Sequence, residues 1–171
     1  MLDDSYKNAA ILIVDDQEAN VDILVGFLEN QGYTNLKATI HPRTAVALVK
    51  SFDPDIILLD LLMPHLSGFE ILSQLKAVIA ANSYLPILVL TADITIESKQ
   101  RALALGAKSF LAKPYDLHEV GLNIKNLLFT RYLAQQLENQ NIILEEKVKE
   151  RTAYLEEKLA GLTGANVVAE S

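Results

Sequence analysis

Five short apolar runs alternate with segments of helical periodicity between residues 10 and 128 of this 171-residue chain. Two of the runs, ILIV at residues 11–14 and IILL at residues 56–59, are apolar at every position. Such runs are typical of strands whose two faces are both covered by helices. Strict alternation of strands and helices predicts an α/β fold with a doubly wound, five-stranded parallel sheet. The predicted strands are Ala10–Val14, Leu36–Thr39, Ile56–Leu59, Pro86–Leu90 and Ser109–Leu111.

The chain changes in character after about Asn126, where Glu, Gln, Asn and Lys dominate and no Pro or Gly occurs before Gly161. This composition favours a long helix that follows the α/β domain. We therefore predict a domain over residues 8–128, a helical linker over 129–162 and a tail without regular structure over 163–171.

The predicted linker carries an apolar heptad pattern. Arg151 and Lys158 occupy two later d positions and weaken its C-terminal half. Asn141 falls on an a position, where a buried Asn favours parallel dimers. The pattern predicts a parallel homodimer, with a helix docked on its own domain as the alternative. Apolar or small residues of the pattern are Ala134, Leu137, Leu144, Val148, Leu155 and Leu162.

Composition narrows the classes of function. The chain has no cysteine, so it offers no disulfide framework and no thiolate nucleophile. Its formal net charge of −7 argues against direct binding of nucleic acid, whose phosphates need a basic face. No apolar stretch approaches the length of a membrane span, and the acidic N-terminus does not resemble a secretory signal. These features predict a cytoplasmic protein without a membrane segment.

Polar side chains stand where four of the predicted strands end. They are Asp15, Asp16, Asp60, Thr91 and Lys113. In an open α/β sheet, ligands bind outside the carboxyl ends of the strands, so these residues are expected to converge. Two carboxylates ~4 Å apart repel by about 4 kcal/mol at an effective dielectric near 20, unless a cation lies between them. Hard oxygen ligands without His or Cys favour Mg²⁺, which often helps to bind phosphates.

Each of these residues also has a simpler interpretation when it is taken alone. One carboxylate of the Asp15–Asp16 pair can cap the helix that follows. Thr91 can merely lead into the next helix, and Lys113 can be a solvated surface cation. The functional interpretation therefore depends on all five residues occurring together, in order, at strand ends.

The motifs around these residues resemble the response-regulator receiver domain of two-component signalling. The resemblance covers Asn8–Leu128 and implies a flavodoxin-like sheet of strand order 2-1-3-4-5. The later segment ILEEKVKERTAYLEEKL resembles linkers that join receivers to HD-GYP phosphodiesterase, diguanylate cyclase or histidine-kinase modules. The motifs that carry the resemblance are VDD at 14–16, DLLMPHLSG at 60–68, TA at 91–92 and FLAKP at 110–114.

The resemblance implies a role for each matching residue. Asp60 would accept a phosphoryl group, Lys113 would pair with it, and Thr91 would donate a hydrogen bond to it. Phe110 would be the aromatic residue that turns inward on activation.

The resemblance also implies a Mg²⁺ site with Asp16, Asp60 and the backbone carbonyl of Leu62 as ligands. Asp15 would act through a metal-bound water. The Leu62 side chain cannot orient an attacking water, and Asp93 could repel hydroxide. These two positions predict a long-lived phosphorylated state.

The favoured function is a response regulator that accepts phosphate from a sensor histidine kinase or phosphotransfer protein. It would catalyse only its own phosphorylation and dephosphorylation and would change surface and dimer geometry. A stand-alone relay or adaptor receiver is the first alternative. A flavodoxin-like redox protein is the second, although Asp15 and Asp16 would repel a flavin phosphate.

Overall fold

The computed structural model describes residues 6–81 and 83–169, and their side chains up to residue 164. The chain divides into two compact units, Met1–Tyr132 and Leu133–Ser171. The first contains the sheet and its covering helices, and the second consists of the later part of the last helix.

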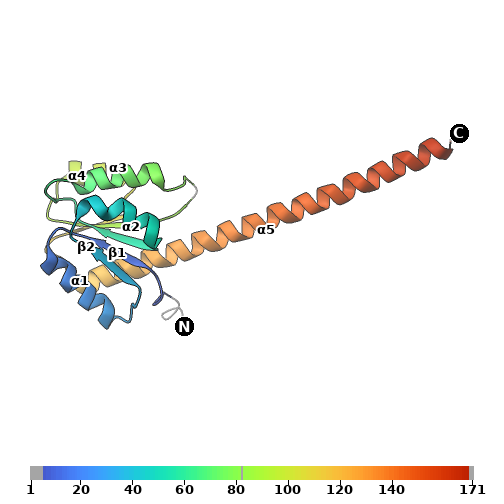
Figure 1. The fold of residues 1–171 in the computed structure, drawn as a ribbon. Helices are drawn as coiled ribbons and strands as arrows, with labels where there is room; N and C mark the ends of the chain where they lie inside the picture. The colour runs from blue at the N-terminus through green and yellow to red at the C-terminus, as the bar shows by residue number, and fades with distance from the viewer. Residues whose placement is uncertain (1–5, 82, 170–171) are drawn as a thin grey trace. The chain divides into compact units, whose positions relative to one another are not determined.

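The first unit is built on a five-stranded parallel sheet of order β2-β1-β3-β4-β5. This confirms the predicted doubly wound, flavodoxin-like sheet. The neighbouring strands β1 and β2 are labelled in Figure 1. The two central strands β1 and β3 are buried at every position, as their unbroken apolar sequences predict. The strands are β1 Ile11–Val14, β2 Leu36–Thr39, β3 Ile56–Leu59, β4 Ile87–Thr91 and β5 Ser109–Ala112.

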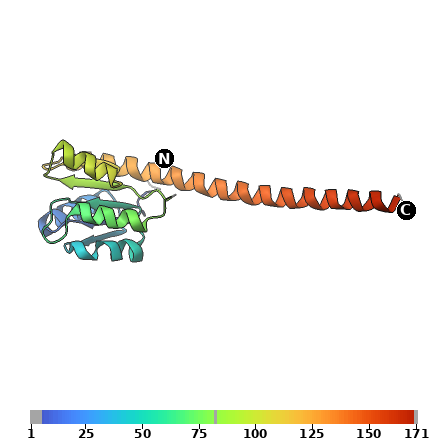
Figure 2. The ribbon, with the colours of Figure 1, turned by 90° about the horizontal axis from the view of Figure 1, so that it is seen from above.

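Helices cover both faces of the sheet (Figure 2). Alternate strand residues serve the two cores because successive side chains of a strand point to opposite faces. Leu12 of β1 packs in the core under α2, α3 and α4, whereas Ile13 packs in the core under α1 and α5. The helices are α1 Glu18–Asn30, α2 Ala45–Phe52 (preceded by the 3₁₀ turn Pro42–Thr44), α3 Gly68–Val78, α4 Ile96–Ala104 and α5 Leu117–Ala169.

The last turns of α5 within the first unit contact residues that precede strands β1, β3 and β4. Arg131 Nε donates to Asp55 Oδ1 at 2.9 Å, and Arg131 Nη1 donates to the backbone carbonyl of Tyr84. The ring of Tyr6 makes edge-on contacts with Phe129 and Tyr132, at centroid distances of 6.5 and 6.1 Å. These contacts explain why the compact unit extends to Tyr132.

The helix α5 continues to Ala169, whereas the sequence predicted no regular structure from residue 163 onward. Gly161 and Gly164 each lower helix propensity by about 1 kcal/mol relative to Ala, but they keep the backbone hydrogen bonds that a proline would break. In the structure, residues 163–169 belong to α5, and residues 170–171 lie outside the described part.

The apolar side chains of the heptad pattern are exposed in the second unit. Leu137, Leu144, Val148, Leu155 and Leu162 are all largely accessible to solvent. Among the residues that the structure describes, no helix has the length and apolar character that crossing a membrane requires.

Candidate functional site

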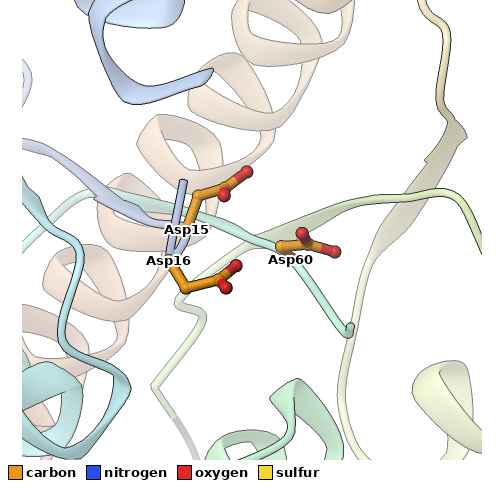
Figure 3. A group of neighbouring side chains, drawn as sticks. All are labelled: Asp15, Asp16 and Asp60. Carbon is orange, nitrogen blue, oxygen red and sulfur yellow. The ribbon is translucent and has the colours of Figure 1, made fainter. Parts of the chain in front are cut away.

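Three carboxylates meet at the carboxyl ends of two neighbouring strands. Asp15 and Asp16 directly follow β1, and Asp60 directly follows β3. The two strands are paired in register, with Val14 opposite Leu59, so the residues after them are adjacent. Ligand oxygens of all three residues lie within 4.8 Å of one another (Figure 3). The structure thus brings Asp60 next to two carboxylates that lie 45 and 44 positions earlier in the sequence.

Lys113 supplies the positive charge of this cluster. It follows β5, and its Nζ donates to Asp15 Oδ2 at 2.9 Å and to Asp60 Oδ2 at 3.1 Å. Burial alone would lower the pKa of Lys113, but the hydrogen bonds and charges of the two aspartates outweigh burial and raise this pKa above its ordinary value. The ammonium therefore stays protonated at neutral pH and contacts two of the three carboxylates.

The oxygens of the cluster differ in their hydrogen bonds. Asp60 Oδ1 accepts from the backbone N–H of Leu62 at 3.1 Å, and both oxygens of Asp15 accept from protein donors. Asp16 Oδ1 is buried and has no donor among the residues that the structure describes. A buried, unpartnered carboxylate oxygen is costly unless a cation or water satisfies it. The donor set, all hard oxygen, fits Mg²⁺.

Comparison with known proteins identifies the fold unit that carries this cluster. The sequence pattern that defines the response regulator receiver domain matches residues 11–125. The chain belongs to this family. It is therefore a receiver domain of two-component signalling, as the motifs predicted, followed by a long helix.

Relatives with curated descriptions and solved structures agree with this assignment. The receiver is 35% identical over 130 residues to the transcriptional regulatory protein YvrH of Bacillus subtilis, covering 76% of this chain and 53% of YvrH. It is 32% identical over 166 residues to the alkaline phosphatase synthesis transcriptional regulatory protein PhoP of the same organism, covering 91% and 68%. The chain thus spans about half to two thirds of the length of these relatives. The structure of the chemotaxis protein CheY4 of Vibrio cholerae superposes with a TM-score of 0.65 at 28% identity, covering 70% of this chain and 98% of CheY4.

The receiver's two predicted switch residues lie on the neighbouring strands β4 and β5. Thr91 ends β4, is fully buried, and its Oγ1 accepts from the backbone N–H of Asp93 at 3.3 Å. Phe110 on β5 is half-buried, opposite Val89 of β4, with the Lys99 ammonium 6.0 Å from its ring centroid. The strand ends thus bring Thr91 to the same edge of the sheet as the carboxylates, whereas Phe110 is not at that edge.

The loop after β4 is tied to the start of α4. The Asp93 carboxylate accepts from the backbone and the hydroxyl of Thr95, at 3.1 and 2.8 Å, and from the hydroxyl of Ser98. These hydrogen bonds, that of Ser98 foremost, lower the pKa of Asp93 below its ordinary value. The Asp93 carboxylate therefore connects this loop to α4, while the backbone N–H of Asp93 donates to Thr91.

An apolar hollow of about 600 Å³ lies beside Lys113. The hollow is open to solvent, and two of its lining residues, Asn20 and Lys113, donate hydrogen bonds to the Asp15 carboxylate. Its lining residues are Asn20, Ile23, Ala92, Lys113, Pro114, Tyr115 and Leu117.

Gly68 allows helix α3 to approach the backbone of Asp60. A Cβ atom at this position would lie 2.3 Å from the Asp60 carbonyl oxygen and 2.7 Å from the Leu61 Cα. The helix begins at Gly68 because Ser67 and Glu70 form a reciprocal capping box. The glycine thus permits close packing of the helix start against the strand end that carries Asp60.

Replacing Gly68 with Ala should destabilise the receiver by about 1–3 kcal/mol, the usual cost of overpacking a rigid site. The clash is with backbone atoms, which cannot rotate away. Urea unfolding measures the change. The matched control is Gly26→Ala in α1, where an added Cβ meets nothing within 4 Å. That variant should gain about 0.5–1 kcal/mol from helix propensity. Equal stability of the two variants would show that the approach of α3 is not tight.

Asn20 contacts the carboxylate cluster and was not singled out from the sequence. Its side-chain amide donates to both oxygens of Asp15, at 3.1 and 3.4 Å. An Asn in the first turn of a helix is common and gave no distinctive signal.

Proposed function

We propose that Asp60 accepts a phosphoryl group from a phosphohistidine of a sensor histidine kinase or a phosphotransfer protein. An Asp60 oxygen attacks phosphorus, the phosphorus–nitrogen bond breaks, and the imidazole nitrogen keeps the electron pair and takes up a proton. The observation that carries this proposal is the Lys113 ammonium between Asp60 and Asp15, beside the unpartnered oxygen of Asp16. Intact-mass analysis after incubation with Mg²⁺ and acetyl phosphate tests it.

The proposed Mg²⁺ ligands are Asp16, Asp60 and the backbone carbonyl of Leu62, with Asp15 acting through a metal-bound water. Bound there, Mg²⁺ would supply positive charge that reduces the repulsion between these carboxylates and an incoming phosphoryl group. Lys113 contributes a second positive charge next to Asp60 and remains protonated at neutral pH because its pKa is raised. Positioning and charge are most of what phosphoryl transfer requires from a protein.

We further propose that phosphorylation moves Thr91. Its hydroxyl now accepts from the Asp93 N–H, and phosphoryl oxygens on Asp60 would offer it a stronger, charged acceptor. Phe110, on the strand beside it, would then turn inward. Because Asp93 connects the loop after β4 to α4, we expect these movements to change the receiver surface at α4.

The apolar hollow beside Lys113 is the surface that we assign to the phosphodonor protein. A histidine that delivers phosphate must reach Asp60 next to Lys113, and the hollow adjoins that ammonium. Apolar contact at this hollow would hold the partner while Lys113 meets the charged phosphoryl group.

The proposed output is a parallel homodimer through the helix over residues 129–162. Support comes from the exposed apolar side chains of the heptad pattern, since an isolated helix cannot bury them. A stand-alone relay receiver is the second candidate, and a monomeric full chain would favour it. The flavodoxin-like redox alternative stays disfavoured because a flavin phosphate would meet Asp15 and Asp16.

The curated relatives and the charge of the chain both bear on its output partner. The relatives YvrH and PhoP are described as transcriptional regulatory proteins, and the chain spans only part of each. We propose that this segment itself makes no direct contact with nucleic acid, because its formal net charge is −7. A cytoplasmic location follows from the proposed partners.

Replacing Leu62 with Asn or Glu should shorten the lifetime of the phosphorylated receiver. The Leu62 side chain is 51% exposed and offers no hydrogen bond to an attacking water. A polar side chain there should speed phosphate loss roughly tenfold, the effect of about one hydrogen bond in the transition state. A phosphate-release time course measures the lifetime. Leu62→Met, which stays apolar, should keep the wild-type lifetime, and unchanged lifetimes for Asn and Glu would contradict the prediction.

A further inference from the structure

Asn20 lies in the first turn of α1, half-buried beside the carboxylate cluster. Its Nδ2 is 3.1 Å from Asp15 Oδ2, 3.4 Å from Asp15 Oδ1 and 3.3 Å from Gln17 Oε1. All three neighbouring atoms are acceptors. The amide NH₂ of Asn20 is therefore the group that faces Asp15.

Asp15 depends on protein donors because it is only 3% exposed. Its Oδ1 accepts from the backbone N–H of Gln17 at 2.9 Å, and its Oδ2 accepts from Lys113 at 2.9 Å and from Asn20. A buried carboxylate without such donors would be strongly destabilising. Asn20 and Lys113 meet at the same oxygen, so Asn20 restrains the oxygen that binds the ammonium.

We propose that Asn20 is a positioning residue for phosphoryl transfer, whose amide holds the Asp15 carboxylate against Lys113. The inference rests on the proposed function of Asp60. Lys113 is shared between Asp15 and Asp60, and Asp60 gives up one anionic oxygen when it forms the acyl phosphate. The ion pair between Lys113 and Asp15 then keeps the ammonium beside the phosphoryl group. Asn20 acts on the reaction through Asp15 and does not touch the reacting atoms.

A purely structural role makes the opposite prediction for one substitution. Gln17 caps α1 without a side-chain hydrogen bond, so Asn20 could serve only the start of this helix. A carboxylate in the first turn stabilises a helix through the macrodipole. Asn20→Asp should then be harmless if the helix start is all that matters. If Asn20 serves Asp15, the same change places two carboxylates in contact and should be worse than Asn20→Ala.

The experiment compares Asn20→Ala, Asn20→Asp and the control Ala19→Asp in the full chain. Ala19 is exposed in the same helical turn, so the control adds the same charge away from Asp15. Two quantities are measured: the melting temperature without Mg²⁺, and the initial rate of Asp60 labelling by acetyl phosphate with saturating Mg²⁺. The first does not depend on phosphorylation.

We expect both quantities to fall in the order wild type, Asn20→Ala, Asn20→Asp, with Ala19→Asp close to wild type. The labelling rate of Asn20→Ala should drop about tenfold, as for loss of one hydrogen bond to a charged group. A melting temperature of Asn20→Asp equal to or above that of wild type would overturn the inference, as would labelling rates unaffected by either change. A wild-type chain that takes up no phosphate would instead overturn the proposed function and, with it, the catalytic part of this inference.

Discussion

Replacing Asp60 with Asn should abolish labelling of this receiver by acetyl phosphate in the presence of Mg²⁺. The amide cannot attack phosphorus as a carboxylate does. Its single oxygen can still accept from the Leu62 N–H, and Lys113 keeps its hydrogen bond to Asp15, so the variant should remain folded. Intact-mass analysis should show a single added phosphate on the wild type and none on Asp60→Asn.

Two further measurements make this result decisive. Asp22→Asn removes an exposed carboxylate from α1, away from the cluster, and should label like the wild type. Melting curves of all three proteins verify that they are folded. Equal labelling of Asp60→Asn and wild type would contradict the assignment and would direct attention to Asp15 and Asp16 as acceptors.

A chain that ends at Ala134 should be monomeric at concentrations where the full chain is dimeric. The truncation removes the exposed apolar side chains at Leu137, Leu144, Val148 and Leu155, which form the proposed dimer contact. It retains Arg131 and its contacts with Asp55 and Tyr84, so the receiver unit itself should keep its stability. Light scattering at tens of micromolar measures the mass of both chains.

A substitution at Asn141 tests the same helix through the same measurement. Asn141→Leu should tighten association, because a buried polar pair gives way to an apolar one. It should also loosen the choice of orientation or oligomer number, which a buried Asn pair restricts. A full chain that remains monomeric, or a truncated chain that dimerises equally well, would show that this helix does not assemble the protein.

Much of the fold could be predicted because it depends on local patterns. The runs at β1 and β3 are apolar at every position, and only a sheet covered on both faces buries such runs completely. The predicted class and strand number are confirmed, and so is the strand order that the family resemblance implied. The ends of these runs also showed where Asp15, Asp16 and Asp60 would converge, because parallel strands share one carboxyl edge. The roles of these residues in phosphoryl transfer stay predictions.

Side-chain directions and contacts between distant residues were decided only by the tertiary structure. The sequence indicates a cluster of carboxylates, but not that Asp15 is saturated with donors while Asp16 Oδ1 has none among the described residues. That difference depends on how α1 starts, which brings the Asn20 amide back to Asp15.

The end of the receiver unit depends in the same way on contacts across the fold. The pairing of Arg131 with Asp55 joins residues 76 positions apart, so no local pattern could reveal it. The sequence patterns therefore determined the strands and the edge where the polar residues meet, and the family resemblance implied the strand order. The tertiary structure decided which oxygens remain open and where the compact unit stops, since both depend on distances between groups that the sequence does not place side by side.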